Sequence, residues 1–208
     1  MKFESLIFDI DGTLWDSRAL VAEGYNIQLK AEGLEHLYTN AEALRPLFGK
    51  VMTEIGDVLF ASIPQPERYG LMERCMETEN RYLFENECKI GYPLVKKTME
   101  ALAKNHRLFI VSNSQCGYPE LCMDKLGIRD LISGYLCFGD TGTCKGETIK
   151  TLMAKHGITD ACYIGDTQGD YEAAVHAKIP FVWCAYGFGT PDDYALRVES
   201  FEELKDVL

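Results

Sequence analysis

Short apolar runs recur along the chain, and each one ends in polar residues. The first covers residues 5–8 and stops at Asp9. Continuous apolar runs of about 4–8 residues are typical of strands buried on both faces of a parallel sheet. The pattern predicts strands at Ser5–Phe8, Leu108–Val111, Ala161–Ile164 and Phe181–Cys184, and a weaker one at Gly134–Phe138.

Helical patterns fill the intervals between the later runs. They cover roughly residues 93–105, 118–126, 145–156 and 169–177. Glycine follows two of these stretches, where it commonly ends a helix. Alternation of strand and helix from about residue 88 onward predicts an α/β fold, with a doubly wound, Rossmann-like parallel sheet.

A different pattern lies between the first strand and the rest of the sheet. Residues 15–86 contain three or four helical stretches and no clear strand, and the longest stretches are Ser17–Glu32 and Glu67–Asn86. Within this segment Thr39-x-x-Glu42 predicts a capping box at the start of a short helix.

This arrangement predicts two domains. We expect an α/β core domain formed by residues 1–15 and 87–208, with an inserted helical cap domain of residues 16–86. The alternative is that the same helices pack on the sheet as ordinary layers.

Composition and charge narrow the class of protein. Of the 208 residues, 47% are hydrophobic, which is ordinary for a globular chain. No apolar run approaches the roughly 18 residues that span a bilayer, and the N-terminus lacks the apolar core of a signal peptide. The net charge is −11, so the chain lacks the excess of basic residues that is typical of nucleic-acid binding. We therefore expect no membrane and no nucleic-acid partner.

Cysteine usage indicates the compartment of the protein. No pair shows C-x-x-C spacing, and no cysteine–histidine group has the spacing of a zinc site. We interpret the cysteines as small buried hydrophobes in a reduced, cytoplasmic environment. They are Cys75, Cys88, Cys116, Cys122, Cys137, Cys144, Cys162 and Cys184.

Polar side chains follow three of the predicted strands. In open parallel sheets, ligands bind beyond the carboxyl ends of the strands, so these groups are expected to meet. Four carboxylates at one place repel each other unless a cation lies between them. Oxygen ligands suit a hard ion such as Mg²⁺. The residues are Asp9 and Asp11, Ser112 and Asn113, and Asp166 and Asp170.

Four segments together resemble the motifs of the haloacid dehalogenase-like (HAD) hydrolases. They are Asp9-Ile10-Asp11-Gly12-Thr13-Leu14, Ser112-Asn113, Lys145 and Gly165-Asp166-Thr167-Gln168-Gly169-Asp170, in the family's order. The resemblance covers essentially the whole chain. The insertion after the first motif looks like the helical cap of the phosphoglycolate phosphatase and β-phosphoglucomutase branch.

The resemblance implies roles for the first motif. Asp9 is the expected nucleophile, which forms an aspartyl-phosphate. Asp11 is the expected general acid and base. Gly12 allows a tight turn, and Thr13 braces the loop. Both are expected at the substrate.

It also implies how phosphate and metal are held. Ser112 and the Asn113 N–H are expected to hold the phosphoryl group, and Lys145 is the expected phosphate-binding lysine. The residues expected around a Mg²⁺ ion are Asp9, the backbone carbonyl of Ile10, Asp11, Asp166 and Asp170. Asp166 is expected as a direct ligand, and Asp170 as a ligand directly or through water.

Two cap cations are candidates for substrate contact. Arg45 and Lys50 lie in a segment that helps to read the substrate in related enzymes. Solvated surface charge explains them equally well.

These expectations converge on a Mg²⁺-dependent phosphatase that is similar to phosphoglycolate phosphatase and acts on a small phosphorylated metabolite. Asp11 argues against a dehalogenase, because dehalogenases of this family lack the second aspartate. The alternatives are a sugar-phosphate mutase, a pyrophosphatase or a non-catalytic phosphometabolite-binding protein. The expected oligomeric state is a monomer or a weak homodimer.

Overall fold

Six parallel strands form one sheet. The computed structural model describes residues 3–87 and 89–208, so Met1, Lys2 and Cys88 lie outside the described residues. The strands are β1 (Ser5–Phe8), β2 (Arg107–Ser112), β3 (Ile132–Cys137), β4 (Ala161–Gly165), β5 (Phe181–Cys184) and β6 (Leu196–Val198). Their spatial order is β3-β2-β1-β4-β5-β6, and each neighbouring pair is parallel. This confirms the predicted α/β fold.

The register of the central strands positions the candidate site. Phe8, the last residue of β1, is aligned with Ile110 of β2 and with Ile164 of β4. The segments that follow these three strands therefore leave the sheet at the same edge, although they are far apart in the sequence.

The edge strand β6 is the one strand that the sequence pattern does not predict. It has three residues, which is too short for a periodic signal. The weaker candidate at 134–138 is confirmed as β3, which begins two residues earlier than predicted.

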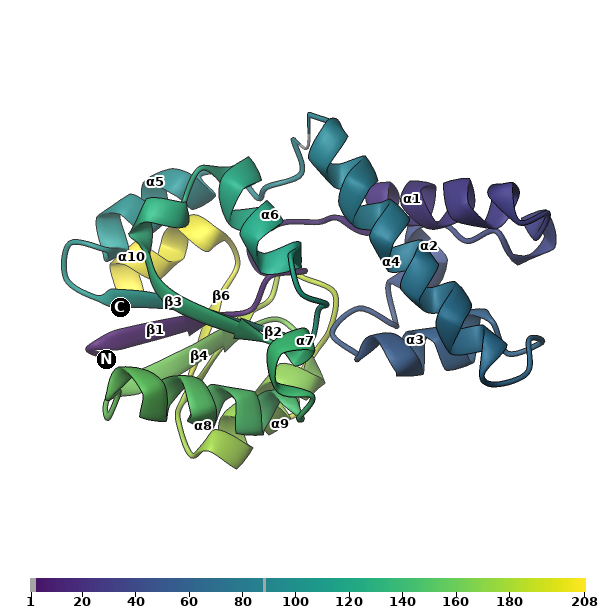
Figure 1. The fold of residues 1–208 in the computed structure, drawn as a ribbon. Coiled ribbons are helices and arrows are strands. Elements are labelled where there is room, and N and C mark those ends of the chain that lie inside the picture. The colour runs from purple at the N-terminus through teal and green to yellow at the C-terminus, as the bar shows by residue number, and fades with distance from the viewer. Residues whose placement is uncertain (1–2, 88) are drawn as a thin grey trace.

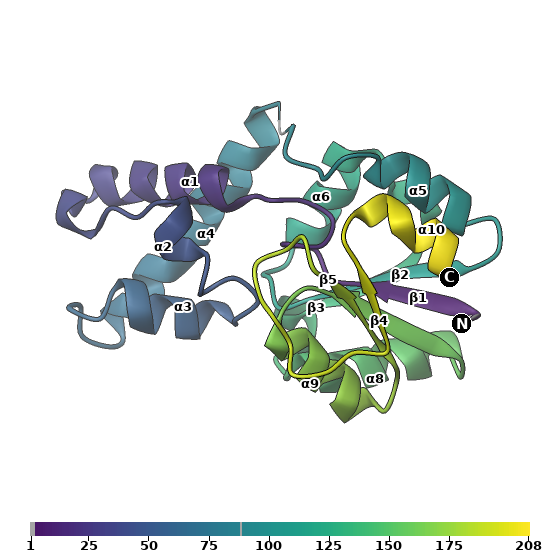
Figure 2. The same ribbon diagram turned by 180° about the vertical axis from the view of Figure 1, so that it is seen from behind.

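Helices cover both faces of the sheet (Figure 1, Figure 2). Along β1, Leu6 and Phe8 pack into one apolar layer and Ile7 into the other, because successive side chains of a strand alternate between faces. One layer holds α5 (Val95–Leu102), α6 (Tyr118–Leu126) and α10 (Leu204–Val207). The other holds α8 (Lys145–His156) and α9 (Gln168–Ala177), and the short α7 (Phe138–Thr141) follows β3.

Four helices lie to one side of the sheet (Figure 1). They are α1 (Arg18–Ala31), α2 (Ala41–Leu44), α3 (Met52–Leu59) and α4 (Glu67–Glu85), and we call residues 18–85 the helical insertion. Its helices share an apolar cluster of their own, built around Tyr25, Leu29 and Phe60. The division into domains at residues 15/16 and 86/87 stays a prediction.

The capping box predicted at Thr39 is wrong, because the helix is capped one residue later by a side chain alone. Asn40 is the N-cap of α2, and its side-chain oxygen accepts the backbone N–H groups of Glu42 and Ala43 at 3.1 and 3.0 Å. The Thr39 N–H instead donates to Asn26 at 2.9 Å. Both residue types cap helices well, so their order alone did not decide between them.

Two further observations concern the described residues as a whole. None of their helices combines the length and the apolarity needed to cross a bilayer. Their seven cysteines are free, and five of them, including Cys162 and Cys184, are buried as predicted for small apolar side chains. Cys116 and Cys144 are exposed, so the expectation of burial is wrong for these two.

Candidate active site

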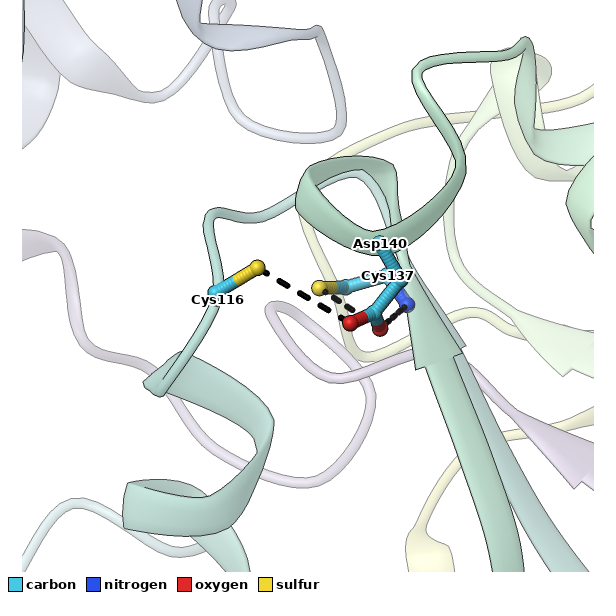
Figure 3. Close-up of side chains that lie close together, drawn as sticks. All are labelled: Cys116, Cys137 and Asp140. Atoms are coloured by element: carbon cyan, nitrogen blue, oxygen red, sulfur yellow. Dashed lines mark hydrogen bonds between the residues drawn. The ribbon is translucent and has the colours of Figure 1, made fainter.

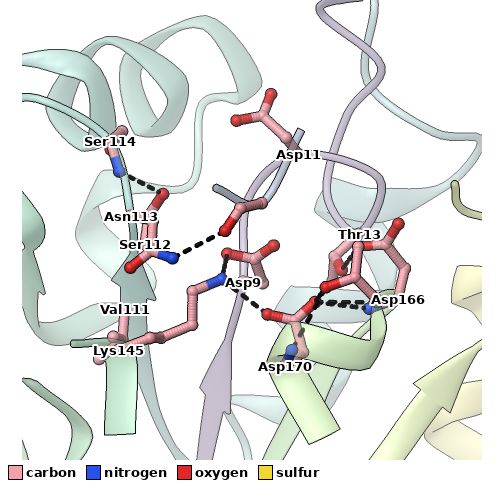
Figure 4. Close-up of polar contacts among 12 residues, drawn as sticks. Asp9, Asp11, Thr13, Val111, Ser112, Asn113, Ser114, Lys145, Asp166 and Asp170 are labelled. Carbon is pink, nitrogen blue, oxygen red and sulfur yellow. Dashed lines mark hydrogen bonds and ion pairs between the residues drawn. The ribbon is translucent and has the colours of Figure 1, made fainter. Parts of the chain in front are cut away.

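Three carboxylates meet beyond the carboxyl ends of β1 and β4 (Figure 4). Asp9 follows β1, Asp166 follows β4 and Asp170 lies in the first turn of α9. One oxygen of each lies within 4.8 Å of the others, and all three side chains are buried. The strand register thus unites two segments that the sequence separates widely.

A tight loop carries the chain away from Asp9. The Ile10 carbonyl accepts the backbone N–H groups of Thr13, Leu14 and Trp15 at 3.2, 2.7 and 3.3 Å. The loop therefore already occupies this carbonyl, and its expected role as a metal ligand stays a prediction that these contacts do not favour.

Gly12 makes this loop possible for two reasons. Its φ of +80° lies in the left-handed region that favours glycine. A Cβ at this position would also lie 2.1 Å from an oxygen of Asp166. Gly12 therefore allows the two loops to approach each other closely. The neighbouring Thr13 is fully buried, and its hydroxyl donates to Asp166 at 3.4 Å.

Lys145 is the cation of the cluster. It begins α8, where the helix dipole disfavours a positive charge, yet its side chain is buried. Its Nζ lies 2.9 Å from Asp9 Oδ1 and 2.6 Å from Asp170 Oδ1. Burial alone would lower the pKa of Lys145, but these carboxylates outweigh burial and raise it. Lys145 is therefore held as a charged amine.

The three carboxyl groups differ in how well their charge is compensated. Burial and the neighbouring Asp170 raise the pKa of Asp9 to about 7. Burial would also raise the pKa of Asp170, but Lys145 and Thr167 hold it below its usual range. Burial, Asp170 and Asp9 raise the pKa of Asp166 well above its usual range. Negative charge at Asp166 is thus the least compensated.

Asp170 owes its position to a capping box at the start of α9. Its Oδ2 accepts the Thr167 N–H and hydroxyl at 2.9 and 2.7 Å, while the Thr167 hydroxyl accepts the Asp170 N–H. The same Oδ2 accepts the Asp166 N–H at 3.1 Å. One carboxylate therefore fixes both the helix start and the neighbouring aspartate.

The cluster fits a hard divalent cation. Its ligands are carboxylate oxygens, which Mg²⁺ prefers. Lys145 pairs with two of the three carboxylates, and no ion pair to Asp166 is present among the described residues. A cation would supply the compensation that Asp166 lacks.

Asp11 lies apart from these three carboxylates. Its Oδ1 accepts the Trp15 indole N–H at 2.9 Å, the Ser17 hydroxyl at 2.6 Å and the Tyr118 hydroxyl at 2.8 Å. Burial raises the pKa of Asp11 to about 6, and these hydrogen bonds offset part of the rise. Asp11 is therefore positioned by neutral donors.

The polar residues after β2 connect the sheet to the helical insertion. The buried Ser112 hydroxyl accepts the Ser114 N–H at 3.2 Å. The Asn113 amide donates to the backbone carbonyl of Gly49 at 2.7 Å. Both strand-end residues border the same pocket as Asp9.

The loop after β5, which contains Tyr186-Gly187-Phe188-Gly189, lies on the other side of the cluster. The Phe188 N–H donates to Asp166 Oδ2 at 2.7 Å. The Tyr186 hydroxyl donates to the Thr13 carbonyl at 2.8 Å. This loop therefore holds both a candidate metal ligand and the first motif.

A pocket of about 30 Å³ lies between the cluster and the helical insertion. The core contributes Asp9, Asp11 and Lys145, and Lys50 lines it from the insertion side. Arg45 is exposed and is not among the described lining residues. The expectation that Arg45 contacts substrate is therefore not supported.

The residues that the sequence reasoning missed come from long-range packing. Ser17 and Tyr118 hold Asp11, and Glu79 reaches the pocket from α4. None belongs to a short pattern, so only their position in the fold identifies them.

A second group of possible metal ligands lies at the end of β3 (Figure 3). The thiols of Cys137 and Cys116 lie 3.2 and 3.8 Å from carboxylate oxygens of Asp140, and the Cys137 N–H donates to Asp140 at 2.8 Å. Burial raises the pKa of Cys137 to about 12, so it remains a thiol. We interpret the group as the cap of α7.

Comparison with known proteins supports the resemblance to the haloacid dehalogenase-like hydrolases. A family model described as haloacid dehalogenase-like hydrolase matches residues 6–184. The chain is 29% identical over 190 residues to a phosphoglycolate phosphatase of Aquifex aeolicus (strain VF5), covering 88% of this chain and 85% of that one. It is 26% identical over 207 residues to a 5'-nucleotidase of Pseudomonas aeruginosa, covering 93% and 87%.

Solved structures share the fold. CbbY from Rhodobacter sphaeroides, in complex with phosphate, superposes with a TM-score of 0.78 at 18% identity and covers 98% of this chain and 96% of its own. A haloacid dehalogenase-like family hydrolase from Streptococcus pneumoniae gives a TM-score of 0.81 at 19% identity, with 99% and 98% covered. Because the family match spans most of the chain and includes Asp9, Lys145 and Asp166, the chain belongs to the haloacid dehalogenase-like hydrolase family.

Proposed function

We propose that this hydrolase is a phosphatase that cleaves small phosphate monoesters through an aspartyl-phosphate on Asp9. The observation that carries the proposal is the buried cluster at the pocket, where Lys145 binds one oxygen of Asp9 and leaves the other without a charged partner among the described residues. The relatives named phosphoglycolate phosphatase and 5'-nucleotidase support it.

In the first step the Asp9 carboxylate attacks phosphorus. A bond forms between an Asp9 oxygen and phosphorus, and the bond between phosphorus and the alcohol oxygen breaks. Asp11, which lines the same pocket, gives its proton to the departing oxygen. A carboxyl pKa of about 6 suits a group that must change protonation near neutral pH.

In the second step water attacks the phosphorus of the aspartyl-phosphate. Asp11 takes a proton from this water, the bond between phosphorus and Asp9 breaks, and inorganic phosphate leaves. We assign Ser112, Asn113, Gly12 and Thr13 to the phosphoryl site.

Three residues would hold the metal that we propose, Mg²⁺. These are Asp9, Asp166 and Asp170, whose oxygens cluster within 4.8 Å, and Asp11 is left out because its carboxylate faces other donors. When bound, the ion offsets the negative charge of the phosphoryl group. The cap domain that we propose at residues 16–86, which contains the helical insertion, shields the pocket from water.

Phosphate release tests the proposal. Wild type, D9N and D130N are assayed with p-nitrophenyl phosphate and small natural esters, with Mg²⁺ and with EDTA. Asp130 is exposed, so D130N controls for the change of side chain. We expect Mg²⁺-dependent release by wild type and D130N, and a loss of about 10⁴-fold or more in D9N.

Three results would contradict it. D9N as active as D130N would exclude the assigned nucleophile. Isomerisation of a sugar phosphate faster than phosphate release would favour a mutase. Tight binding of a phosphate ester with no release by folded wild type would favour a binding protein.

A further inference from the structure

Three buried polar atoms at the pocket lack a hydrogen-bond partner. They are Glu79 Oε2, Asn113 Oδ1 and Ser114 Oγ, and their residues all line the pocket. Buried polar groups in folded proteins are almost always hydrogen-bonded, so an unpaired set at one pocket calls for a partner from outside the chain. Asn113 Oδ1 accepts, Ser114 Oγ can accept or donate, and Glu79 Oε2 accepts as a carboxylate or donates as a carboxylic acid. A ligand hydroxyl, which both donates and accepts, can therefore pair with these atoms.

Glu79 is held firmly at this position. It lies on α4, and the residue is only 3% exposed. Helices α1 and α4 approach so closely beside it that a Cβ on Gly24 would lie 2.8 Å from the Glu79 Cα. The backbone of Glu79 therefore has little freedom to move its carboxyl group out of the pocket.

The surroundings of Glu79 make it the distinctive polar group of the insertion side. Most of that side is apolar, from residues such as Val21, Leu44, Phe48 and Ile55. An apolar wall gives a ligand shape but little orientation. Among the polar residues on this side, Tyr25, Lys50 and Glu79, Glu79 keeps a buried oxygen without a partner in the described part of the chain and can orient a leaving group there.

The charge of the pocket restricts which leaving groups fit. Its described lining contains three carboxyl groups, Asp9, Asp11 and Glu79, and two amines, Lys50 and Lys145. Lys145 already contacts two carboxylates. Lys50 is 47% exposed and lies 3.9 Å from Glu54. A ligand carboxylate beside Glu79 would therefore add negative charge where no free buried cation compensates it.

The ionisation of Glu79 reflects the same crowding. Burial and the charge of Asp11 raise the pKa of Glu79 to about 8, although Tyr25 and Gln115 offset part of the rise. A hydroxyl can donate to a carboxylate or accept from a carboxylic acid, so it satisfies Glu79 in either state.

We propose that this pocket selects phosphate esters whose leaving group is a short alcohol with a second hydroxyl, which Glu79 binds, and that it rejects esters whose leaving group carries a carboxylate. The inference rests on the proposed phosphatase function. It separates this chain from the chemistry named for its phosphoglycolate phosphatase relatives, since glycolate carries a carboxylate.

A matched pair of substrates tests this inference. 2-Hydroxyethyl phosphate and 2-phosphoglycolate differ only in a terminal hydroxymethyl or carboxylate group, and phosphoethanolamine offers an ammonium instead. The value of kcat/KM is measured for each with wild type, E79Q and E77Q in Mg²⁺. Glu77 is exposed on the same helix, so E77Q removes the same charge outside the pocket.

We expect wild type and E77Q to prefer 2-hydroxyethyl phosphate over 2-phosphoglycolate by about 10-fold or more. At pH 9, above the Glu79 pKa of about 8, E79Q is expected to narrow this ratio, because there Glu79 is a carboxylate and the amide that replaces it no longer repels the carboxylate of 2-phosphoglycolate. p-Nitrophenyl phosphate is assayed in parallel as a reference for turnover.

The outcomes separate the two proposals. Equal ratios in E79Q and E77Q, or a wild-type preference for 2-phosphoglycolate, would overturn the inference and leave the phosphatase intact. Turnover of p-nitrophenyl phosphate without turnover of either matched ester would also overturn it. A faster reaction with phosphoethanolamine than with 2-hydroxyethyl phosphate would overturn the proposed preference for a hydroxyl, and would show that the pocket prefers an ammonium group in the leaving group. No release from any ester would overturn the proposed function itself.

Discussion

The two walls of the pocket are built differently. On the core wall, Asp9, Asp170 and Lys145 are buried and already joined by short ion pairs. On the wall from the helical insertion, apolar side chains surround Glu79, which keeps one oxygen unpaired. Groups that are already paired are preorganised for one reaction, whereas an unpaired group is available to bind a ligand. We infer that the core wall determines the chemistry and the insertion determines the substrate.

Removing the central cation should break the core wall. We expect K145M to lower kcat/KM by about 10³-fold and the free energy of unfolding by about 3 kcal/mol, because two buried carboxylates lose their partner. Activity assays and urea denaturation in EDTA measure the two effects. The control K150M removes an exposed lysine of the same helix and should change stability by about 0.5 kcal/mol or less. Similar results for both variants would contradict the importance of the buried pair.

The loop that supports the core wall can be tested by a pair of glycine variants. Gly12 and Gly142 both have positive φ, but only Gly12 has a close neighbour, since nothing lies within 4 Å of a Cβ on Gly142. G142A should lose about 1 kcal/mol from backbone strain, and G12A about 3 kcal/mol, because its methyl group also displaces Asp166. Thermal denaturation measures the difference. Equal losses would mean that the loop can move away from Asp166.

The insertion wall should carry a pH-dependent cost. The folded-state pKa of Glu79, about 8, lies above its ordinary value of 4.5. Between these values the unfolded chain releases a proton that the folded chain keeps, so the stability of wild type falls as the pH rises. Glutamine does not titrate, so the stability of E79Q relative to wild type should rise by about 3–4 kcal/mol between about pH 5 and about pH 8.

Urea denaturation in EDTA at both pH values measures this change, with E77Q as the control. A difference between E79Q and wild type that is the same at both pH values would show that Glu79 ionises normally in the folded protein.

The smallest effect on kcat is expected from a residue that positions Asp11. Y118F removes one of three hydrogen bonds to Asp11, and we expect kcat to fall about 5- to 10-fold, or about 1 kcal/mol. Tyr135 makes a comparable bond to Glu120 at 3.0 Å, outside the lining of the pocket. Y135F should therefore leave kcat unchanged, and a similar loss in both variants would point to a general effect on the fold.

Local patterns were sufficient to predict the core wall. Asp9, Ser112 and Asp166 each follow an apolar run, and parallel pairing brings strand ends together whatever lies between them in the sequence. Two helices, 118–126 and 145–156, have the predicted ends. The Ile10 carbonyl could not be placed, because three amides compete for it within the folded loop.

The insertion wall was not predictable in the same way. Glu79 lies on a long helix among other charged residues, and only its packing against α1 distinguishes it from the exposed Glu77. Arg45 and Lys50 were equally plausible as surface charges, and the fold separates them, with Lys50 at the pocket and Arg45 outside its lining. Which face a helix buries depends on tertiary contacts that spacing alone does not give.

Phe188 contacts both walls of the pocket. Its N–H binds Asp166 at 2.7 Å. Its ring meets Phe48 edge-on, with 5.6 Å between centroids, and lies 4.5 Å from the Arg18 guanidinium carbon, both from the helical insertion. A swing of the insertion that opens the pocket must therefore break these ring contacts or drag the loop that holds Asp166. One residue therefore ties the helical insertion to the position of a candidate metal ligand, so a substitution at Phe188 bears on both sides of the pocket at once.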